Sequence, residues 1–320
     1  MRIAAVIVTH AGGRLLAECL ASLAAQTRPP DEVLVVVSRD DVLPVTGAPV
    51  LQLRANVGYA RAANAGIAAT SGEPLLLNDD TRLDPGCLAA LERAFGVAGR
   101  TGGVFQPRIV LADGSGRLDN LGHGLFPDGA VWARGRNGPD RAPAGAPGGF
   151  SGAAVLFARA TWDALGGFDP RFGSFGEDVD LSLRLLRRGI PITAVPDAVV
   201  HHHLGATWGR ASAAKLHAIE RNRVRAAVRS LPLTALLSMP AWTAGRYALF
   251  AALAARGRGP GDGVDSEAQR AAIAGLAAGV RDAPTWWRAR RADRRTWTRG
   301  ELATWRALWA GRARWEDVGR

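Results

Sequence analysis

Three carboxylates lie close together at the start of a predicted helix. Glu177, Asp178 and Asp180 follow the glycine-rich segment 173–176, and leucines continue after them at helical spacing. Acids in the first helical turn can cap free backbone N–H groups and interact favourably with the helix dipole. Held rigidly at the mouth of a cleft, a carboxylate there could instead take a proton from a substrate. Whether these acids cap the helix or take part in catalysis depends on the other polar clusters of the sequence.

A second acidic cluster follows the apolar run 75–77, which is predicted as a buried strand. Asn78, Asp79 and Asp80 stand at its end. Ligands of open α/β sheets bind at the carboxyl ends of strands, and hard oxygen donors suit Mg²⁺ or Mn²⁺ that also touches a diphosphate. The alternative is capping of the helix expected after Asp84.

Three consecutive histidines end another predicted strand. Strand alternation places His201 and His203 on one face and His202 on the other. Imidazole is a common ligand of transition metals and accepts Mn²⁺. A surface histidine cluster without a metal role is the alternative.

A glycine-containing turn precedes the helix predicted over 58–69. Gly58 lets the chain turn sharply and lets a ligand approach the backbone. Arg61 and Asn64 are three residues apart and share one helix face. An arginine there can meet a phosphate, and an asparagine a sugar or base. An ordinary loop with a surface arginine would give the same pattern.

Alternating strands and helices must position these groups. Continuous apolar runs predict buried strands at 3–8, 33–37, 50–53 and 75–77, and helices are predicted at 15–23 and 58–69. This order is typical of a doubly wound, mostly parallel α/β sheet. Further strands are predicted at 104–110, 150–157, 191–195 and 198–203, further helices at 84–98, 161–165, 217–229 and 266–280, and a hairpin with a mobile loop at 113–147.

Two common nucleotide-binding motifs are missing. The turn after the first strand, residues 9–14, does not supply GxGxxG, and GxxxxGK[ST] does not occur in the chain. The sequence therefore disfavours the dinucleotide-binding and P-loop versions of such a sheet.

The composition indicates an anionic partner and a reducing compartment. Forty Lys and Arg against 29 Asp and Glu give a net charge of +11, and Lys215 is the single lysine. The C-terminal third is rich in arginine, so a membrane surface, a phosphorylated lipid or nucleic acid are candidate partners. Cys19 and Cys87 form no CxxC pair or disulfide framework, which favours a cytoplasmic location. The first apolar run is too short for a signal peptide.

The C-terminal region, residues 226–320, is predicted to be helical. Its apolar stretch 231–255 fits a basic amphipathic helix in the membrane interface. Packing on the catalytic domain or on another subunit of a homo-oligomer, or a membrane span, are alternatives. Beyond it, tryptophans from Trp286 to Trp315 interleave with arginines, a pattern of lipid-headgroup boundaries and also of single-stranded nucleic-acid binding.

Taken in order, the motifs resemble those of a known family. The matching pieces include 6–10, 56–66, 77–80, 151–153, 166–169, 177–181 and 196–203. Over residues 1–225 the chain resembles inverting family-2 glycosyltransferases with the GT-A fold, closest to actinobacterial rhamnosyl- and galactofuranosyltransferases. The resemblance implies a catalytic domain at 1–225 and a C-terminal helical appendage at 226–320.

The resemblance also implies roles at the donor site. Thr9 would contact the nucleotide base. The second strand lacks the aspartate that the family usually has at its end, and Asp40 would substitute for it. The remaining donor-binding positions are Asn56, Gly58, Arg61, Asn64, Asn78 and Asp79.

At the reaction centre the resemblance implies a general base at Asp178 and a divalent cation, Mg²⁺ or Mn²⁺. Asp80 matches the last acid of the family's metal motif, and His202, or next His201, matches an additional metal ligand. Gly152, Glu177 and Asp180 would shape the acceptor side.

The implied activity is transfer of rhamnose or a related sugar, with inversion, from a nucleotide diphosphate to a lipid-linked saccharide or polysaccharide. The reaction would take place at the inner face of the cell membrane. UDP-galactofuranose and UDP-GlcNAc are alternative donors. An inactive sugar-binding or scaffolding member is a rival from another class, and a nucleic-acid-binding protein is a further rival that the family resemblance disfavours.

Overall fold

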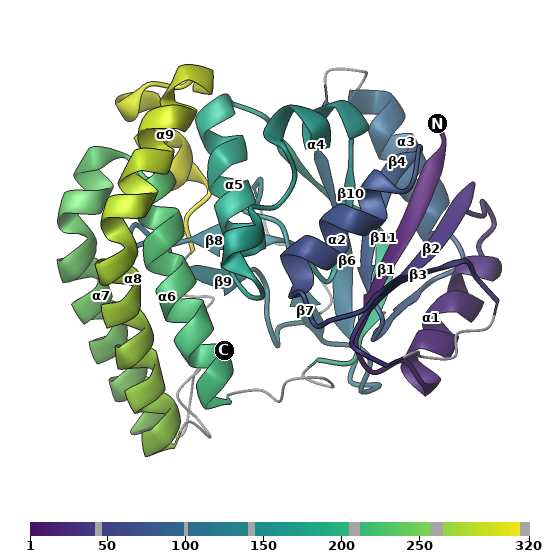
Figure 1. Ribbon diagram of the computed structural model, residues 1–320, viewed down its shortest axis with the longest axis horizontal. Coiled ribbons are helices and arrows are strands. Elements are labelled where there is room, and N and C mark those ends of the chain that lie inside the picture. Colours follow the sequence, from purple (N-terminus) through teal and green to yellow (C-terminus); the bar gives the residue numbers. More distant parts are fainter. Residues whose placement is uncertain (42–46, 99–101, 140–144, 205–211, 257–264, 314–320) are drawn as a thin grey trace.

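The computed structural model describes residues 1–41, 47–98, 102–139, 145–204, 212–256 and 265–313. A mixed β-sheet lies between two layers of helices, and the C-terminal helices form a separate group beside it (Figure 1). The strands are β1 (Ile3–Thr9), β2 (Glu32–Ser38), β3 (Val50–Leu53), β4 (Glu73–Asn78), β5 (Thr81–Leu83), β6 (Val104–Leu111), β7 (Leu118–Asn120), β8 (His123–Leu125), β9 (Val131–Ala133), β10 (Ala154–Phe157) and β11 (Ile192–His202).

The sheet follows the order β3-β2-β1-β4-β10-β6-β11-β5, with β7 paired to β6. The first four strands in this order run parallel, as their continuous apolar runs predicted. Strand β10 is antiparallel to β4 and β6, and β5 is antiparallel to β11. The doubly wound α/β arrangement is confirmed, and these antiparallel pairs make the sheet a mixed one.

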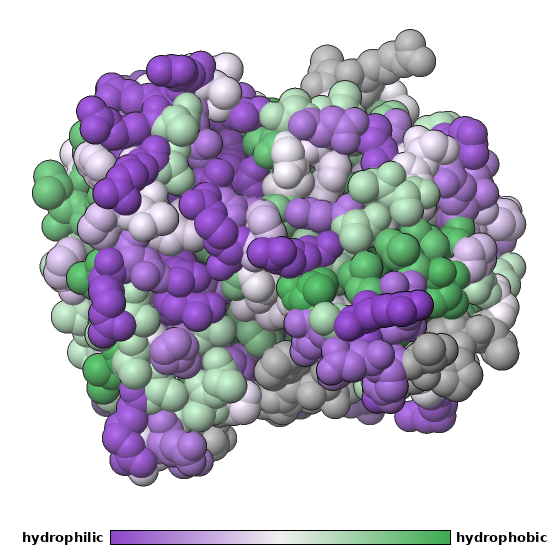
Figure 2. Space-filling model, viewed as in Figure 1, coloured by the Kyte–Doolittle hydropathy of each residue, from purple (hydrophilic) through white to green (hydrophobic). Residues whose placement is uncertain are grey.

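Helices cover both faces of the sheet because side chains of successive strand residues point to opposite faces. On one face α1 (Arg14–Ala24) and α3 (Cys87–Ala98) pack on Ile3, Ala5 and Ile7. On the other face, α2 (Tyr59–Ala68), α4 (Arg159–Leu165) and α5 (Glu177–Arg188) pack on Val6 and Val8. In the space-filling view, apolar residues gather near the edge strand β3, where Val50 is exposed (Figure 2).

Three details differ from the sequence predictions. The two strands expected at 191–195 and 198–203 form one strand, β11, whose pairing with β6 shifts register between Val195 and Val199. The short strand β5 was not predicted. In the 113–147 stretch the predicted hairpin is present as β8–β9, and the strand β7 was not predicted; residues 140–144 of its expected loop lie outside the described residues.

The C-terminal helices share a core with α5. They are α6 (Ala213–Ser230), α7 (Leu233–Ala254), α8 (Ser266–Asp293) and α9 (Glu301–Ala310). Phe172 and Leu183 pack in one cluster with Val224, Trp286 and Leu308. Helix α6 runs across the boundary expected at residue 225, α8 is longer than predicted, and α9 was not predicted. In the described ranges, no helix has the length and apolarity needed to cross a membrane.

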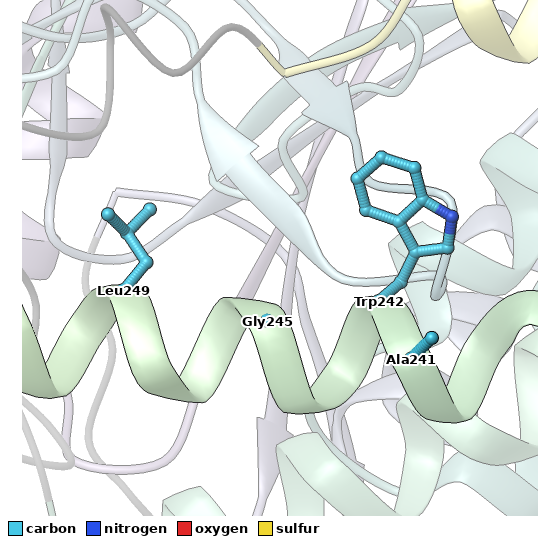
Figure 3. Close-up of a pocket in the computed structure, with 4 residues that line it drawn as sticks. All are labelled: Ala241, Trp242, Gly245 and Leu249. Carbon is cyan, nitrogen blue, oxygen red and sulfur yellow. The ribbon is translucent and has the colours of Figure 1, made fainter.

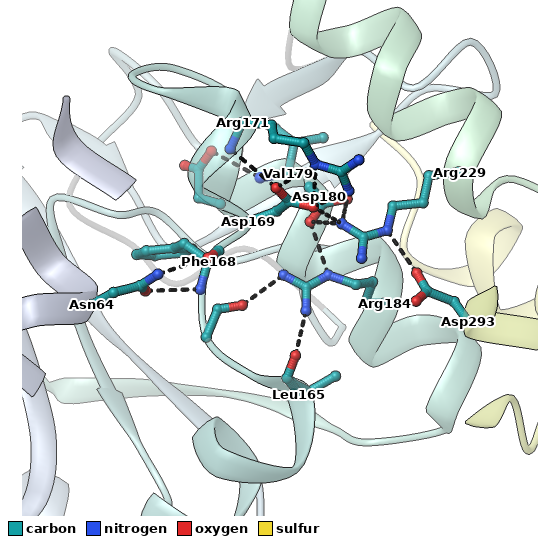
Figure 4. A network of polar contacts seen from close by, with 12 residues as sticks. Asn64, Leu165, Phe168, Asp169, Arg171, Val179, Asp180, Arg184, Arg229 and Asp293 are labelled. Carbon is teal, nitrogen blue, oxygen red and sulfur yellow. Dashed lines mark hydrogen bonds and ion pairs between the residues drawn. The ribbon is translucent and has the colours of Figure 1, made fainter. Parts of the chain in front are cut away.

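Buried ion pairs fix α5 to its surroundings (Figure 4). The fully buried Asp180 accepts from Arg184 Nε at 2.8 Å and from Arg229 Nη1 at 3.1 Å. Arg184 also donates to the carbonyl oxygens of Leu165 and Gly167, each at 2.7 Å. The helix that carries Asp178 is therefore tied to the segment before it and to α6.

Candidate active site

Two neighbouring strands end side by side and present Thr9 and Asp79. Strands β1 and β4 are parallel, with Val8 paired to Asn78, so their carboxyl ends lie at the same edge of the sheet. The Thr9 hydroxyl donates a hydrogen bond to Asp79 Oδ2. Burial raises the pKa of Asp79 to about 6; the Thr9 bond opposes this rise, and the charge of Asp80 adds to it.

The unpredicted strand β5 brings Asp80 to the histidines. Thr81 pairs with His202, so the preceding aspartate lies close to that imidazole. His202 Nε2 is 3.4 Å from Asp80 Oδ1, and its Nδ1 is 2.8 Å from Asp119 Oδ2. Burial opposes the charged form of His202, but the hydrogen bond to Asp119 and the charges of Asp80 and Asp119 outweigh it and raise its pKa to about 9.

Asp119 orients the imidazole from behind. It also accepts from Arg136 Nη1 at 3.0 Å. Burial would raise the pKa of Asp119, but the bond and charge of His202 and the charge of Arg136 lower it below its usual range. A carboxylate on one ring nitrogen leaves the other nitrogen, Nε2, facing Asp80, which is the usual second-shell arrangement of a metal-binding histidine.

His201 lies on the opposite side of β11. Its Nε2 is 2.8 Å from Asp84 Oδ1. The alternation predicted from the sequence is present, and it separates His201 from the Asp80–His202 pair. The structure therefore places His202, the preferred candidate ligand, beside Asp80, and it pairs His201 with Asp84.

The Asp80–His202 pair has the donor atoms that a divalent cation needs. Asp80 Oδ1 is buried and makes no hydrogen bond within the described part of the chain. A carboxylate oxygen facing an imidazole nitrogen suits Mn²⁺ or Mg²⁺. Within the same ranges no group of three or more His, Cys, Asp or Glu side chains is arranged to hold a metal. Two protein ligands would leave the other coordination positions to a diphosphate and water.

Asp178 stands at the start of α5, beside Gly152. Asp178 Oδ2 lies 3.4 Å from the Gly152 N–H, which donates to it, and Oδ1 accepts from Val179 N–H at 2.8 Å. Asn78 N–H donates to the carbonyl of Ala153 at 2.9 Å. The segment that contacts Asp178 therefore runs next to the end of β4, where the second acidic cluster lies.

Tyr59 contacts the segment that holds Asp178. Its hydroxyl donates to the carbonyl of Gly152 at 2.9 Å. Burial raises the pKa of this phenol well above its ordinary value, and the charges of four acids add to that rise. In order of effect they are Glu177, Asp178, Asp80 and Asp79. Carboxylates from both acidic clusters thus act electrostatically on one side chain.

The three acids of α5 have three different environments. Asp178 is partly exposed beside Gly152, whereas Asp180 turns away into the buried ion pairs with Arg184 and Arg229. Glu177 is buried, and its Oε2 has no hydrogen-bond partner among the described residues. Burial, followed by the charge of Asp178, raises the pKa of Glu177 well above its usual range. The buried environment therefore favours the neutral form of Glu177.

The expected donor residues occupy the turn before α2 and its first turns. Asn56 Oδ1 accepts from the Gly58 N–H at 3.2 Å. Gly58 has a φ of 80°, and a Cβ there would lie 3.1 Å from the backbone of Gly173, so only glycine fits well. Arg61 is exposed. The Asn64 amide bonds both the N–H and the carbonyl of Phe168, at 3.0 and 2.8 Å, which commits it to holding that loop (Figure 4).

The end of β2 carries Ser38 in place of the expected aspartate. Ser38 Oγ accepts from Val57 N–H at 3.2 Å and thereby holds the turn before α2. Asp40 is exposed two residues further on, beside the Arg39–Asp41 ion pair.

Sequence reasoning missed Tyr59, Asp119 and His123. Tyr59 lies inside the 56–66 motif, but the sequence does not indicate that its hydroxyl contacts Gly152. Asp119 and His123 lie in a glycine-rich stretch without a hydrophobic period, so nothing in the sequence indicated that they approach the reaction centre.

The structure is a doubly wound sheet with acidic clusters at its strand ends. Among the sequence families, the profile of "Glycosyl transferase family group 2" matches residues 75–316, and that of "Glycosyl transferase family 2" matches residues 4–121. The chain belongs to glycosyltransferase family 2, and it is a glycosyltransferase.

One relative with an assigned activity is an N-acetylglucosaminyl-diphospho-decaprenol L-rhamnosyltransferase of Mycobacterium tuberculosis. It is 31% identical over 248 residues, which cover 67% of this chain and 80% of the relative. The resemblance to rhamnosyltransferases stated from the motifs is confirmed.

Solved structures share the fold. The S. aureus TarS fragment 1–349 superimposes with a TM-score of 0.56 at 16% identity, covering 97% of this chain and 90% of that one. GalNAc-T7 with UDP, GalNAc and Mn²⁺ also has a TM-score of 0.56, at 17% identity, covering 72% and 48%. At these identities the likeness establishes the GT-A fold alone.

We predict that Glu177→Gln changes the pH dependence of stability. Because the folded-state pKa of Glu177 is raised, the wild type loses stability as pH rises above the unfolded-state value near 4.5, by up to about 1.4 kcal/mol per pH unit. The glutamine variant lacks this loss, so its free energy of unfolding should gain on that of the wild type between pH 5 and 7. Urea denaturation measures it, with the exposed Asp197→Asn as control. A constant difference would contradict the neutral state of Glu177.

Proposed function

We propose that this chain transfers a sugar, with inversion, from a nucleotide diphosphate to a lipid-linked saccharide, with Asp178 as the general base. The observation that carries this proposal is the backbone link between the two groups: Gly152 contacts Asp178, and the next residue, Ala153, bonds Asn78, two residues before the Asp80 that lies beside His202. The two groups correspond to the two requirements of such a reaction, proton removal from the acceptor and stabilisation of the departing diphosphate.

Asp178 is placed to accept the proton of the acceptor hydroxyl. As the hydroxyl oxygen bonds to the anomeric carbon, the bond from that carbon to the diphosphate breaks on the opposite side, which inverts the centre. The proton passes to a carboxylate oxygen of Asp178, and the electron pair of the broken bond leaves with the diphosphate. The contact with Gly152 and the N-terminal turn of α5 hold the carboxylate in place.

Asp80 and His202 would hold a divalent cation. Such a cation, when bound, neutralises the charge that develops on the leaving diphosphate. Asp119 keeps Nδ1 of His202 engaged and directs Nε2 toward Asp80. Thr9 bonds Asp79, so Asp79 supports this edge of the site.

The relative from M. tuberculosis points to the substrates. Its name states that it transfers L-rhamnose to N-acetylglucosaminyl-diphospho-decaprenol. We extend this class to the present chain: rhamnose or a similar sugar as donor group, and a diphosphate-linked saccharide on a lipid as acceptor. UDP-galactofuranose and UDP-GlcNAc remain the alternative donors, and the presence of both acidic groups argues against an inactive member.

An apolar groove on α7 supports contact with a lipid surface (Figure 3). Ala241, Trp242, Gly245 and Leu249 line a hollow of about 480 Å³. Trp242 lies near Trp309 of α9, with ring centres 6.4 Å apart. Leu237 on α7 is 83% exposed. Exposed apolar side chains beside tryptophans, on a chain of net charge +11, suit the boundary of an anionic membrane at the cytoplasmic face.

Asp178→Asn should lower turnover at least about a hundredfold while leaving donor affinity nearly intact, because the base is lost and the shape is kept. Release of nucleoside diphosphate from nucleotide-linked rhamnose, UDP-galactofuranose and UDP-GlcNAc, with Mg²⁺ or Mn²⁺, measures turnover. The exposed Asp197→Asn serves as the matched control. Near-normal turnover of Asp178→Asn would remove this residue from the role.

Asp80→Asn should weaken Mn²⁺-dependent donor binding by about tenfold or more, because it removes one of two charged or basic metal ligands. Asp84→Asn is the matched control, since Asp84 pairs with His201 in the same way on the other side of β11. Calorimetry with and without Mn²⁺ compares the two. Equal losses in both variants would contradict the assignment of the metal to Asp80 and His202.

Leu237→Glu should reduce binding to phosphatidylglycerol vesicles about tenfold, because burying a leucine in an apolar surface contributes about 1.5–3 kcal/mol. Val97→Glu is the control: Val97 is 91% exposed on α3, beside the sheet. Vesicle co-sedimentation measures both variants. Undiminished pelleting of Leu237→Glu would rule out α7 as the membrane-facing helix.

A further inference from the structure

His123 lies at the start of the β8–β9 hairpin and faces the helix that carries Asp178. Its backbone exchanges hydrogen bonds with Gly149, at 2.7 and 3.0 Å. A Cβ on Gly149 would lie 3.4 Å from His123 Cβ and 3.1 Å from Ser182 Oγ. The absence of a side chain at Gly149 therefore lets His123 and Ser182 approach on the same side of this segment.

Ser182 follows Asp178 by one helical turn, so both lie on one face of α5. The segment after Gly149 is bonded twice to this face. Phe150 N–H donates to Ser182 Oγ at 3.2 Å, and Gly152 N–H donates to Asp178 Oδ2 at 3.4 Å. His123 thus stands beside the face of α5 that presents the proposed base.

The imidazole of His123 has a free nitrogen. Nδ1 is buried and makes no hydrogen bond to any described residue, although the residue as a whole is partly exposed. Leaving a buried nitrogen unpaired is unfavourable, so a ligand that satisfies it is stabilised. Burial lowers the pKa of His123, against the opposing charges of Asp178 and Asp119. A neutral imidazole offers one donor and one acceptor, which matches a sugar hydroxyl.

We propose that His123 binds the acceptor saccharide and holds its reacting hydroxyl beside Asp178. This inference rests on the proposed function in one respect, that the acceptor is a saccharide. The hairpin is rigid enough for the task. Asp128 at its turn is fully buried and bonds Arg246 Nε at 2.9 Å and Arg223 Nη1 at 3.3 Å. The C-terminal helices α6 and α7 thereby fix the wall that carries His123.

The experiment compares His123→Phe, which keeps the ring volume, with His123→Asn, which keeps a polar group near the position of Nδ1. Calorimetry with the full chain and Mn²⁺ measures the affinity for N-acetylglucosamine 1-diphosphate carrying a short alkyl chain. It also measures the affinity for UDP or TDP, whichever the wild type binds more tightly. We expect His123→Phe to weaken binding of the saccharide about three- to tenfold and His123→Asn to weaken it less, with nucleotide affinity unchanged. Thermal melting checks folding, and His123→Ala replaces His123→Phe if that variant unfolds.

Equal saccharide affinity in wild type and variants would overturn the inference, as would parallel loss of saccharide and nucleotide binding at unchanged melting temperature. A wild type that does not bind the saccharide would overturn it too. Saccharide binding that depends on His123 in a chain that transfers no sugar would support the inference and contradict the proposed function.

Discussion

The buried ion pairs of Asp180 with Arg184 and Arg229 are the constraint on which the site depends. Two arginines around one fully buried carboxylate satisfy charges that would be costly to bury alone. They connect α5 to the loop before it and to α6. Asp178 lies two residues away on the same helix, so its position follows from these contacts. The C-terminal helices therefore act as structural partners of the catalytic region, whatever surface they also present.

The sheet could be predicted because strands that are buried on both faces have continuous apolar sequences. The runs at 3–8, 33–37 and 75–77 are continuous and apolar, and each became a buried parallel strand. Strand β5 has only three residues, two of which are polar, and it begins directly after Asp80. The sequence therefore contains no apolar run from which this strand could be predicted. Helix α9 lacks a clear apolar period, because its buried side includes the polar Thr304 as well as Leu308, whereas Leu302 and Trp309 are exposed.

Candidate site residues could be predicted where polar side chains stand at the ends of predicted strands. Asp80 and His202 follow strand ends, and the alternation of the three histidines correctly separated His202 from His201. Asn64 shows where spacing misleads, because a helix-face position does not reveal that its amide bonds the loop at Phe168. Asp119 lies on β7, which pairs with β6, and His123 lies on the β8–β9 hairpin, which contacts Gly149 and is held by the buried Asp128. Packing between segments that are far apart in the chain produces no local sequence pattern from which it could be predicted.

The three acids at the start of α5 are chemically similar but have different environments. Asp180 is neutralised by arginines, and burial keeps Glu177 protonated. If both were ionised and exposed, three like charges would compete for one cation and repel the diphosphate. With one acid paired and one favoured in its neutral form, Asp178 is the partly exposed carboxylate of this stretch. Capping and catalysis were alternatives for this stretch as a whole, but the three acids have separate environments and need not share one role.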